Sequence, residues 1–536
     1  MIKKICLIFV LASFVSGYSI SDEKFFHIRR ALRRIYAHTD KSSVADFDEQ
    51  KSLSKQSSNG DEKLYEDLRG SFSKSLQHLP SGFVDRAAFE SLRYALGTGK
   101  PSDFNKILIG LGIRKLVNPQ ASLAYTLMGN DCWINPIRPA PTFASAETAG
   151  EMVELYWTVL VRDVPFNDFD TNATALAAIA ELNTLSDFRG PKIGGVVTPV
   201  TFLRGNTPGD LTGPYISQFL YQTIPYGNTT IPPEQKVPLP GVANDFMTTF
   251  TDWFTVESGG DTGASIMHDP VPRFIRTARD LSEYVHVDSP GQSALSALFF
   301  LNNLGPTALD PNNPYLSNPT QDGFVTFGFS EILELTRAAI QEGLKAAWYQ
   351  KWQVNRRLRP EEFGFYVQQQ VANGINLGIH PDLITASVLG EIFTAFSSYF
   401  LPQAYPEGSP THPSYPAGHA VLMGAAVTIL KAMFNEAFVI PSPLEPNAAN
   451  TVLVPFGGAL TVGGELNKLA SNIALGRDHG GVHYRSDGID GLLLGEEVAI
   501  DILENEAFLF NEDFSGFSLT KFDGTTIQVG AKRTGT

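Results

Sequence analysis

Cysteine is almost absent from this chain of 536 residues, which contains only Cys6 and Cys132. The first residues, MIKKICLIFVLASFVSGYS, run from two lysines through an apolar stretch to small residues, a pattern typical of a secretory signal peptide over residues 1–19. A buried N-terminal helix is the alternative. Removal of a signal peptide would take Cys6 with it, so no disulfide could form within the remaining chain. We therefore expect a secreted protein, periplasmic or extracellular, that is stabilised by core packing or oligomerisation.

An excess of positive charge is also missing, since 41 lysines and arginines stand against 56 aspartates and glutamates. The formal net charge of −15 argues against a broad surface for nucleic acid or for an anionic membrane. No later apolar run is long enough to predict a membrane span. The chain also lacks the cysteine-rich and haem-binding signatures of redox-active metal proteins. Any anion site must therefore be a local basic cluster inside an acidic protein.

Helical periodicity, by contrast, is abundant. Strand-like alternation is sparse, and its best case is a C-terminal hairpin over residues 517–530 that turns at Asp523-Gly524. We expect a mostly α protein built from helical bundles, with a few short β-hairpins. Apolar residues recur every three or four positions in the segments 147–164, 245–256, 330–354, 383–400, 419–438, 464–477 and 487–508.

Composition also sets the expected domain boundaries. Residues 20–62 combine a short basic amphipathic helix with a polar linker that is nearly free of large apolar residues. The remainder, 63–536, shows no internal repeat at a fixed period. We expect it to form a single large helical domain, with the active-site half at about residues 270–510.

The first of three notable segments is LKAAWYQKWQVNRRLRPEEFG, which carries Lys351 and Arg359. A continuous helix would not place these two residues on one face. Because Pro360 disfavours the α conformation in the residue before it, we expect the helix to end at Arg359. The long side chain of Arg359 can then turn back toward Lys351. Taken alone, the segment also fits a solvated basic helix end that the helix dipole favours.

The second segment is HPSYPAGHAVL, residues 412–422, in which three prolines and a glycine precede an apolar helix. Gly418 allows a close approach of the backbone to a ligand, and His419 offers a proton donor at the same place. The free N–H groups and the dipole of a helix N-terminus attract anions. Ala417 stands where a hydroxyl would be an obvious anion ligand. A plain proline-led helix start is the alternative.

The third segment is ALGRDHGGVHYRSDG, in which Arg477 closes an apolar helix and His483 follows across Gly480-Gly481. Two glycines let the chain turn sharply, so Arg477 and His483 can face one site. A helix–loop–helix connection with surface histidines is the alternative. Together the segments supply guanidinium and ammonium groups that suit an oxyanion. One histidine could then act as ligand or nucleophile and the other as general acid/base.

These three segments, in this order, resemble the signature of the vanadium-dependent haloperoxidases. That family shares its helical scaffold and active site with the type-2 phosphatidic acid phosphatase superfamily. The resemblance extends from about residue 70 to the C-terminus and is strongest to vanadium bromoperoxidases of the brown-algal type. The stretches that carry it are ELYWTVLVRDVPF, RTARDL, AAWYQKWQVNRRLRPE, EGSPTHPSYPAGHA, GELNKLASNIALGR and GVHYRSDGIDGLLLGE.

The resemblance implies a vanadate cofactor in the V5+ state. His483 matches the histidine that binds vanadium axially. Lys351, Arg359, Arg477 and the backbone N–H of Gly418 match the groups that hold the vanadate oxygens. Lys351 also matches the residue that polarises the bound peroxide.

Further residues match the surroundings of the cofactor. His419 matches the acid/base beside the apical oxygen. Trp348 and His412 match residues that line the halide approach, and a histidine at the latter position resembles the bromoperoxidases. Asp280, in RTARDL, matches an acidic residue that is expected to pair with Arg477.

The implied reaction is the oxidation of bromide, and of iodide, by hydrogen peroxide to a hypohalous species that halogenates small organic nucleophiles. The implied assembly is a homodimer or a higher homo-oligomer. One alternative is an acid phosphatase with His483 as nucleophile, against which Trp348 and His412 argue. A degenerate oxyanion-binding protein is the other, against which the two intact histidines His419 and His483 argue. Because Ala417 replaces the serine usual in the family, we expect a working site that binds vanadate less tightly.

Overall fold

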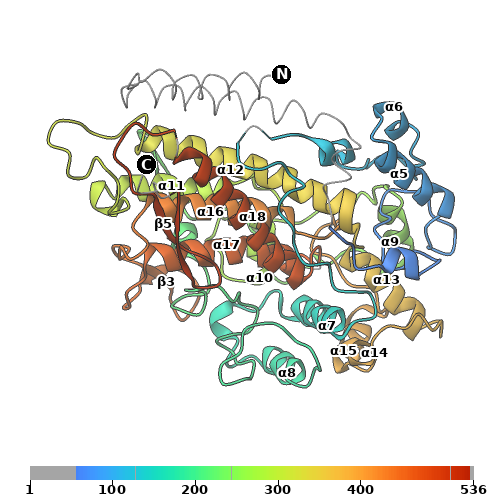
Figure 1. The fold of residues 1–536 in the computed structure, drawn as a ribbon. Coiled ribbons are helices and arrows are strands. Elements are labelled where there is room, and N and C mark those ends of the chain that lie inside the picture. The colour runs from blue at the N-terminus through green and yellow to red at the C-terminus, as the bar shows by residue number, and fades with distance from the viewer. Residues whose placement is uncertain (1–55, 127, 243, 508, 531–536) are drawn as a thin grey trace, which may run out of the picture. The chain divides into compact units, whose positions relative to one another are not determined.

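The computed structural model describes residues 56–530 apart from 127, 243 and 508. The predicted signal peptide 1–19 and residues 20–55 of the predicted helix and linker lie outside the described residues. The prediction of a mostly α protein is confirmed, because helices dominate and the strands form only short pairs. Figure 1 shows the long helices α12, α16, α17 and α18 running through the middle of the molecule.

Each segment with predicted helical periodicity contains a helix. The helices are α4 Asp61–Leu64, α5 Arg86–Thr98, α6 Pro101–Phe104, α7 Ala146–Val161, α8 Ala173–Leu182, α9 Phe250–Glu257, α10 Ala278–Tyr284, α11 Gln292–Asn303, α12 Phe329–Tyr349, α13 Pro360–Val371, α14 Pro381–Ile384, α15 Ser387–Phe396, α16 Gly418–Met433, α17 Val462–His479 and α18 Arg485–Glu506. No helix of the described residues is long and apolar enough to cross a membrane.

Within the described part of the chain, the strands form three antiparallel two-stranded hairpins. The predicted C-terminal hairpin is confirmed as the last of them. The pairs are β1 Ile224–Tyr226 with β2 Thr229–Ile231, β3 Leu444–Pro446 with β4 Leu453–Pro455, and β5 Phe517–Thr520 with β6 Thr526–Val529.

Helix α16 is the centre of the bundle and packs against α12, α17 and α18. It is apolar on all sides, so it is buried along its whole length except at His419. Glycines allow α16 and α18 to approach closely. A Cβ atom on Gly424 would lie 2.2 Å from the carbonyl oxygen of Leu492, and one on Gly495 would lie 2.1 Å from that of Val421. This close packing places the N-terminus of α16 beside that of α18.

The chain leaves α12 earlier than the sequence predicts. A π-helical turn, Gln350–Asn355, follows α12, and Arg356 then adopts a left-handed conformation with φ 43°. Arg359 is the N-cap of α13, with Pro360 at the first helical position, and its backbone N–H donates to Glu362 Oε2 at 2.6 Å. The prediction that Pro360 keeps Arg359 out of a helix is therefore confirmed, but the predicted helix end at Arg359 is wrong because the left-handed residue ends the helical path first.

A buried carboxylate cluster supports the start of α13. Glu361 accepts from Lys74 Nζ at 2.8 Å, with both side chains fully buried. Glu257, the last residue of α9, is 0% exposed, and within residues 56–530 neither of its carboxyl oxygens accepts a hydrogen bond from a backbone N–H or a cationic side chain. Burial and the neighbouring Glu362 raise the pKa of Glu257 well above its ordinary value. Burial lowers the pKa of the adjacent His78 to about 4, so this ring supplies no compensating positive charge near neutral pH.

We expect the substitution Glu257→Gln to reduce the loss of stability at alkaline pH. The folded protein holds the proton of Glu257 to a higher pH than the unfolded chain does. The stabilisation from this proton is therefore complete below about pH 4.5 and is lost as the pH rises through the folded-state pKa. A neutral amide cannot ionise, so denaturant unfolding at acidic and alkaline pH should show a flatter profile for the variant. The exposed Glu66→Gln is the control, and parallel profiles for wild type and Glu257→Gln would contradict the expectation.

Candidate oxyanion site

The three predicted cationic residues meet at the N-terminal ends of α16 and α18. Lys351 Nζ donates to the carbonyl oxygens of Pro413 and Ser414 at 2.6 and 2.8 Å. Arg359 Nε donates to His412 O at 2.9 Å. Its Nη1 donates to Val482 O at 2.6 Å and to His483 Nε2 at 3.0 Å.

Arg477 completes the cationic set from α17. Its Nη1 donates to Val285 O at 2.7 Å, and its guanidinium carbon lies 5.3 Å from the centre of the Tyr405 ring. The Nε atom is buried and has no hydrogen-bond partner. One donor of this buried guanidinium therefore remains available for a bound anion.

None of these three cations forms an ion pair with a carboxylate of residues 56–530. Lys351 and Arg359 are 0% exposed, and Arg477 is 4% exposed. Burial, together with repulsion from the neighbouring guanidinium groups, lowers the pKa of Lys351 well below its ordinary value. Burial lowers the pKa of Arg359 to about 10. Because uncompensated buried charge is strongly unfavourable, the arrangement calls for an anion.

His483 is held by a carboxylate on the side away from these cations. Asp487 Oδ2 accepts from His483 Nδ1 at 2.8 Å, and it also accepts from Ser414 Oγ and from the backbone N–H of Tyr484. The proton therefore sits on Nδ1, and the Nε2 lone pair faces Arg359. Burial and the nearby cations lower the pKa of His483 well below its ordinary value, so the ring is neutral. A neutral ring with an unprotonated Nε2 is the form that binds a metal, and here this nitrogen accepts from Arg359.

The backbone of α16 faces the same place. Ala417 is the N-cap and has no side chain that could cap the helix. The first intrahelical bond runs from Val421 N to Ala417 O, which leaves the N–H groups of the first turn, Gly418 included, without a helical acceptor. The N–H of Ala417 itself donates to the backbone carbonyl of Asp487 at 2.9 Å. This bond ties the start of α16 to the first turn of α18.

His419 lies at the rim of the site and is paired with an acidic residue that the sequence analysis missed. Its Nε2 is 2.9 Å from Asp288 Oδ1, with the histidine side chain 25% exposed. Burial lowers the pKa of His419, while the hydrogen bond to Asp288 opposes this effect. Asp288 stands in the loop between α10 and α11, outside any motif, so no sequence signal pointed to it.

The predicted pair of Asp280 with Arg477 is wrong. Asp280 lies in the first turn of α10 and accepts from the backbone N and the Nε of Arg276, at 3.0 and 3.2 Å. It therefore caps its own helix start. Arg477 instead meets Val285, just beyond the other end of α10.

Trp348 and His412 lie together, as the predicted halide approach requires. Their ring centres are 4.9 Å apart, and a Cβ atom built on Gly418 would contact the Trp348 ring at 3.5 Å. Arg359 Nη2 donates to His412 Nδ1 at 3.0 Å. Burial and the neighbouring Lys351 lower the pKa of His412 well below its ordinary value, so this ring is neutral too. A neutral imidazole and an indole thus flank the cationic cluster.

A helical bundle that buries basic side chains around a neutral histidine defines a class of protein that binds a tetrahedral or bipyramidal oxyanion. Residues 332–512 match the family model for the second helical-bundle domain of VCPO. The chain is 36% identical to the vanadium-dependent bromoperoxidase of Ascophyllum nodosum, over 86% of this chain and 87% of that protein. It is 34% identical to the vanadium-dependent bromoperoxidase of Corallina pilulifera, over 88% of this chain and 94% of that protein.

A solved structure agrees with these relatives. It is the homohexameric second vanadate-dependent bromoperoxidase of Ascophyllum nodosum, with a TM-score of 0.86, 28% sequence identity, and coverage of 96% of this chain and 93% of that chain. The chain belongs to the vanadium-dependent bromoperoxidase family.

We expect inorganic phosphate to bind the cationic cluster and to raise the thermal stability of the protein. A ligand that binds only the folded state stabilises it by about 2.7 kcal/mol at a hundredfold excess over its Kd. Thermal unfolding should therefore shift upward with phosphate but not with chloride at equal ionic strength. Arg359→Gln should abolish most of this shift, while the exposed Arg86→Gln should keep it. An equal response to both anions would show that the cluster is no oxyanion site.

Proposed function

We propose that this chain is a vanadate-dependent haloperoxidase that oxidises bromide, and iodide, with hydrogen peroxide. The observation that carries the proposal is the set of three buried cations, none ion-paired to a carboxylate among the residues that the structure describes, near the Nε2 lone pair of His483. These groups fit vanadate, because they combine one metal-binding nitrogen with charged donors for its oxygens. Bound vanadate supplies a Lewis acid that activates hydrogen peroxide toward halide.

The residues divide the work of holding the cofactor. His483 Nε2 provides the metal-binding nitrogen. Lys351, Arg359, Arg477 and the N–H of Gly418 hold the oxygens and balance their charge. The negative charge of bound vanadate would favour the protonated form of Lys351, whose Nζ is oriented by the backbone carbonyls of Pro413 and Ser414, and this ammonium group could then polarise the peroxide.

His419 handles the proton. Asp288 fixes the ring by its hydrogen bond to Nε2, so the other ring nitrogen, Nδ1, is left for exchange with peroxide at the site. The lowered pKa of His419 favours a neutral ring that can accept a proton from incoming peroxide. Trp348 and His412 line the path by which halide reaches the cationic cluster, and they exclude bulk water from it.

Variants at the two histidines should separate binding from turnover. His483→Ala removes the metal-binding nitrogen, so we expect loss of vanadium retention after dialysis together with loss of activity. His419→Ala leaves the ligands intact, so it should keep bound vanadium and lose most bromination of a dye with peroxide. Metal analysis and a halide-resolved assay measure the two effects. Bromination that persists after vanadate is stripped would reject the proposed function, and phosphate-ester hydrolysis by the metal-free protein would favour the phosphatase alternative.

Ala417→Ser should tighten vanadate binding. A serine there could donate its hydroxyl to a vanadate oxygen, and a hydrogen bond to a charged group is worth about 1.5–3 kcal/mol, or roughly ten- to a hundredfold in affinity. Serine is also a good N-cap, so thermal unfolding without vanadate measures the separate stabilisation of α16. An unchanged vanadate Kd would show that the hydroxyl is dispensable in this chain.

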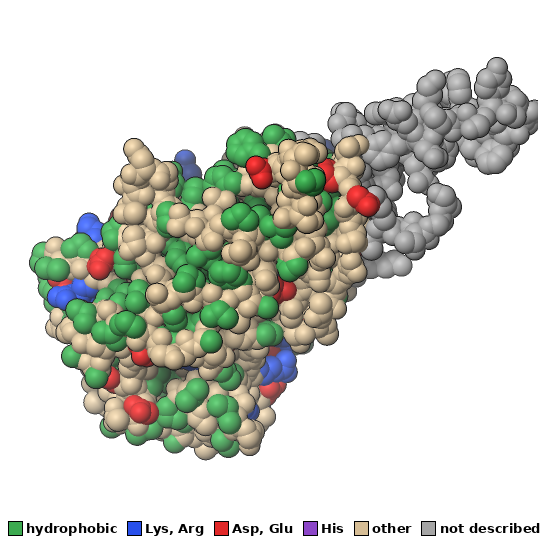
Figure 2. Space-filling view, turned by 90° about the vertical axis from the view of Figure 1, so that its left-hand side faces the viewer, with side chains coloured by type: hydrophobic (Ala, Val, Ile, Leu, Met, Phe, Trp, Pro, Cys, Tyr) green, Lys and Arg blue, Asp and Glu red, His purple; other side chains and the backbone are tan. Residues whose placement is uncertain are grey.

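We further propose that the protein is a homo-oligomer. The homohexameric relative of similar structure supports this proposal. The face in Figure 2 carries many hydrophobic and few charged side chains. The loop between α11 and α12 adds Phe324 and Val325, which are 66% and 75% exposed. Sedimentation velocity tests the assembly, and a wild-type protein that sediments as a monomer would reject it.

Export of the protein is the last part of the proposal. The pattern of residues 1–19 supports it. Burial raises the pKa of the Cys132 thiol to about 12, so this cysteine stays protonated and unreactive in an oxidising compartment. Intact mass of the protein recovered from the medium or periplasm tests cleavage after the signal peptide, and retention of residues 1–19 would contradict it.

A further inference from the structure

A chain of buried hydrogen bonds continues beyond His483 and Asp487. The second oxygen of Asp487, Oδ1, accepts from Arg357 Nη1 at 2.9 Å. Arg357 Nη2 donates to Glu151 Oε2 at 2.9 Å, and the guanidinium carbon lies 3.7 Å from the centre of the Tyr484 ring. Arg357 is 1% exposed. One guanidinium is therefore clamped between two buried carboxylates and an aromatic face.

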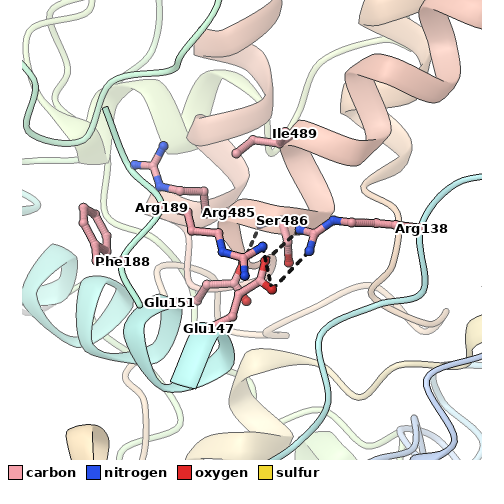
Figure 3. A pocket seen from close by; sticks show the side chains of 8 residues that line it. All are labelled: Arg138, Glu147, Glu151, Phe188, Arg189, Arg485, Ser486 and Ile489. Carbon is pink, nitrogen blue, oxygen red and sulfur yellow. Dashed lines mark hydrogen bonds and ion pairs between the residues drawn. The ribbon is translucent and has the colours of Figure 1, made fainter. Parts of the chain in front are cut away.

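The outer end of this chain is fixed as well. Glu151, on α7, accepts the backbone N–H of Ser486 in the first turn of α18 with its Oε1, at 2.6 Å. Figure 3 shows Glu151 beside Glu147 in a surface pocket that Arg138 and Arg189 also line. Glu147, one turn before Glu151 on α7, pairs with Arg138 at 2.7 Å and with Arg189 at 3.0 Å in the same pocket.

This geometry limits the orientation of the Asp487 carboxylate. Because Oδ1 is bound to Arg357, the plane of the carboxylate is set and Oδ2 points at His483 Nδ1. Glu151 in turn determines where the guanidinium lies. An amide at position 151 would place an NH2 group against either the N–H of Ser486 or the Nη2 of Arg357, and neither of these donors can accept it.

We propose that Arg357 and Glu151 are positioning residues for the vanadium ligand. Acting through Asp487, they fix the Nδ1–H tautomer and the ring orientation of His483, so that Nε2 meets the metal. The inference rests on the proposed function, because it takes metal binding at Nε2 as the purpose of the orientation. A purely structural role is the competing explanation, since Asp487 also accepts from the backbone of Tyr484 at the start of α18.

The variants Arg357→Lys and Glu151→Gln separate the two roles. Lysine keeps the charge but loses the planar fork that bridges two carboxylates. Glu151→Gln keeps the size and shape of the side chain. The matched control is Glu154→Gln on the same helix, which breaks another buried ion pair with α18, that of Glu154 with Arg485 at 2.5 Å.

Two measurements read the orientation directly. Equilibrium dialysis with orthovanadate gives the dissociation constant. Ring-nitrogen NMR of 15N-histidine-labelled protein without vanadate gives the tautomer of His483, assigned by comparison with His483→Gln. We expect Arg357→Lys to raise the Kd for vanadate about ten- to a hundredfold and to mix the tautomers. Glu151→Gln should act in the same direction, and Glu154→Gln should match the wild type in both measurements.

A folded Glu151→Gln protein with wild-type vanadate affinity and an unchanged His483 spectrum would overturn the inference. An equal loss of affinity in Glu154→Gln would overturn it too, because the effect would then come from helix packing. If Arg357→Lys does not fold, the isosteric Glu151→Gln decides alone. If the wild type binds no vanadate, the proposed function fails, whereas the tautomer of His483 in the variants still decides whether the clamp orients the ring.

Discussion

The site depends on buried cationic side chains that are oriented by hydrogen bonds to backbone carbonyl dipoles and are not ion-paired to carboxylates of the described residues. Lys351, Arg359 and Arg477 donate to backbone carbonyl oxygens, those of Pro413, Ser414, His412, Val482 and Val285. A carbonyl fixes the direction of a donor but leaves its positive charge in place. In a low-dielectric interior this charge is felt strongly at short range. Among the described residues no carboxylate is in ion-pair contact with these three groups, so an oxyanion can supply that contact, which explains how an acidic protein with a net charge of −15 can hold one.

The helical scaffold serves this arrangement through close packing of α16 and α18. Gly424 and Gly495 allow backbone contacts that any side chain would block. Two helix N-termini are thereby brought together. The N–H groups in the first turn of α16 have no helical acceptor, whereas that of Ser486 in α18 donates to Glu151, and both helix dipoles place their positive ends near the cationic region. The scaffold thus adds to the positive potential that the side chains create.

The sequence predicted the fold well where one physical signal dominated. Apolar periodicity located α7, α12, α16, α17 and α18, and the Asp-Gly turn located the last hairpin. The prediction from the sequence failed at the end of α12. No residue pattern around Arg356 indicates a π-helical turn that is followed by a residue in the left-handed conformation.

In the site, too, the sequence predicted the residues that lie in contiguous motifs but not their partners from distant segments. The three basic segments and Gly418 are contiguous motifs, and the structure brings them together. Partners that approach from elsewhere in the chain were not predictable in this way. Asp288 pairs with His419 across 131 residues, and Glu151 meets Arg357 across 206. The expected pair of Asp280 with Arg477 was wrong because local sequence does not show which partner a side chain meets in the fold. Asp280, in the first turn of α10, accepts from the nearby backbone N–H of Arg276.

Asp487 connects the two histidine-bearing segments of the site. Its side chain holds His483, while its backbone carbonyl holds the N–H of Ala417 two residues before His419. The proposed metal-binding histidine and the start of the helix that carries the proposed proton-handling histidine are therefore both held by one residue, Asp487. The position of residue 487 therefore bears on both histidines. A substitution at residue 487 that displaces both its side chain and its backbone would therefore disturb both histidines together.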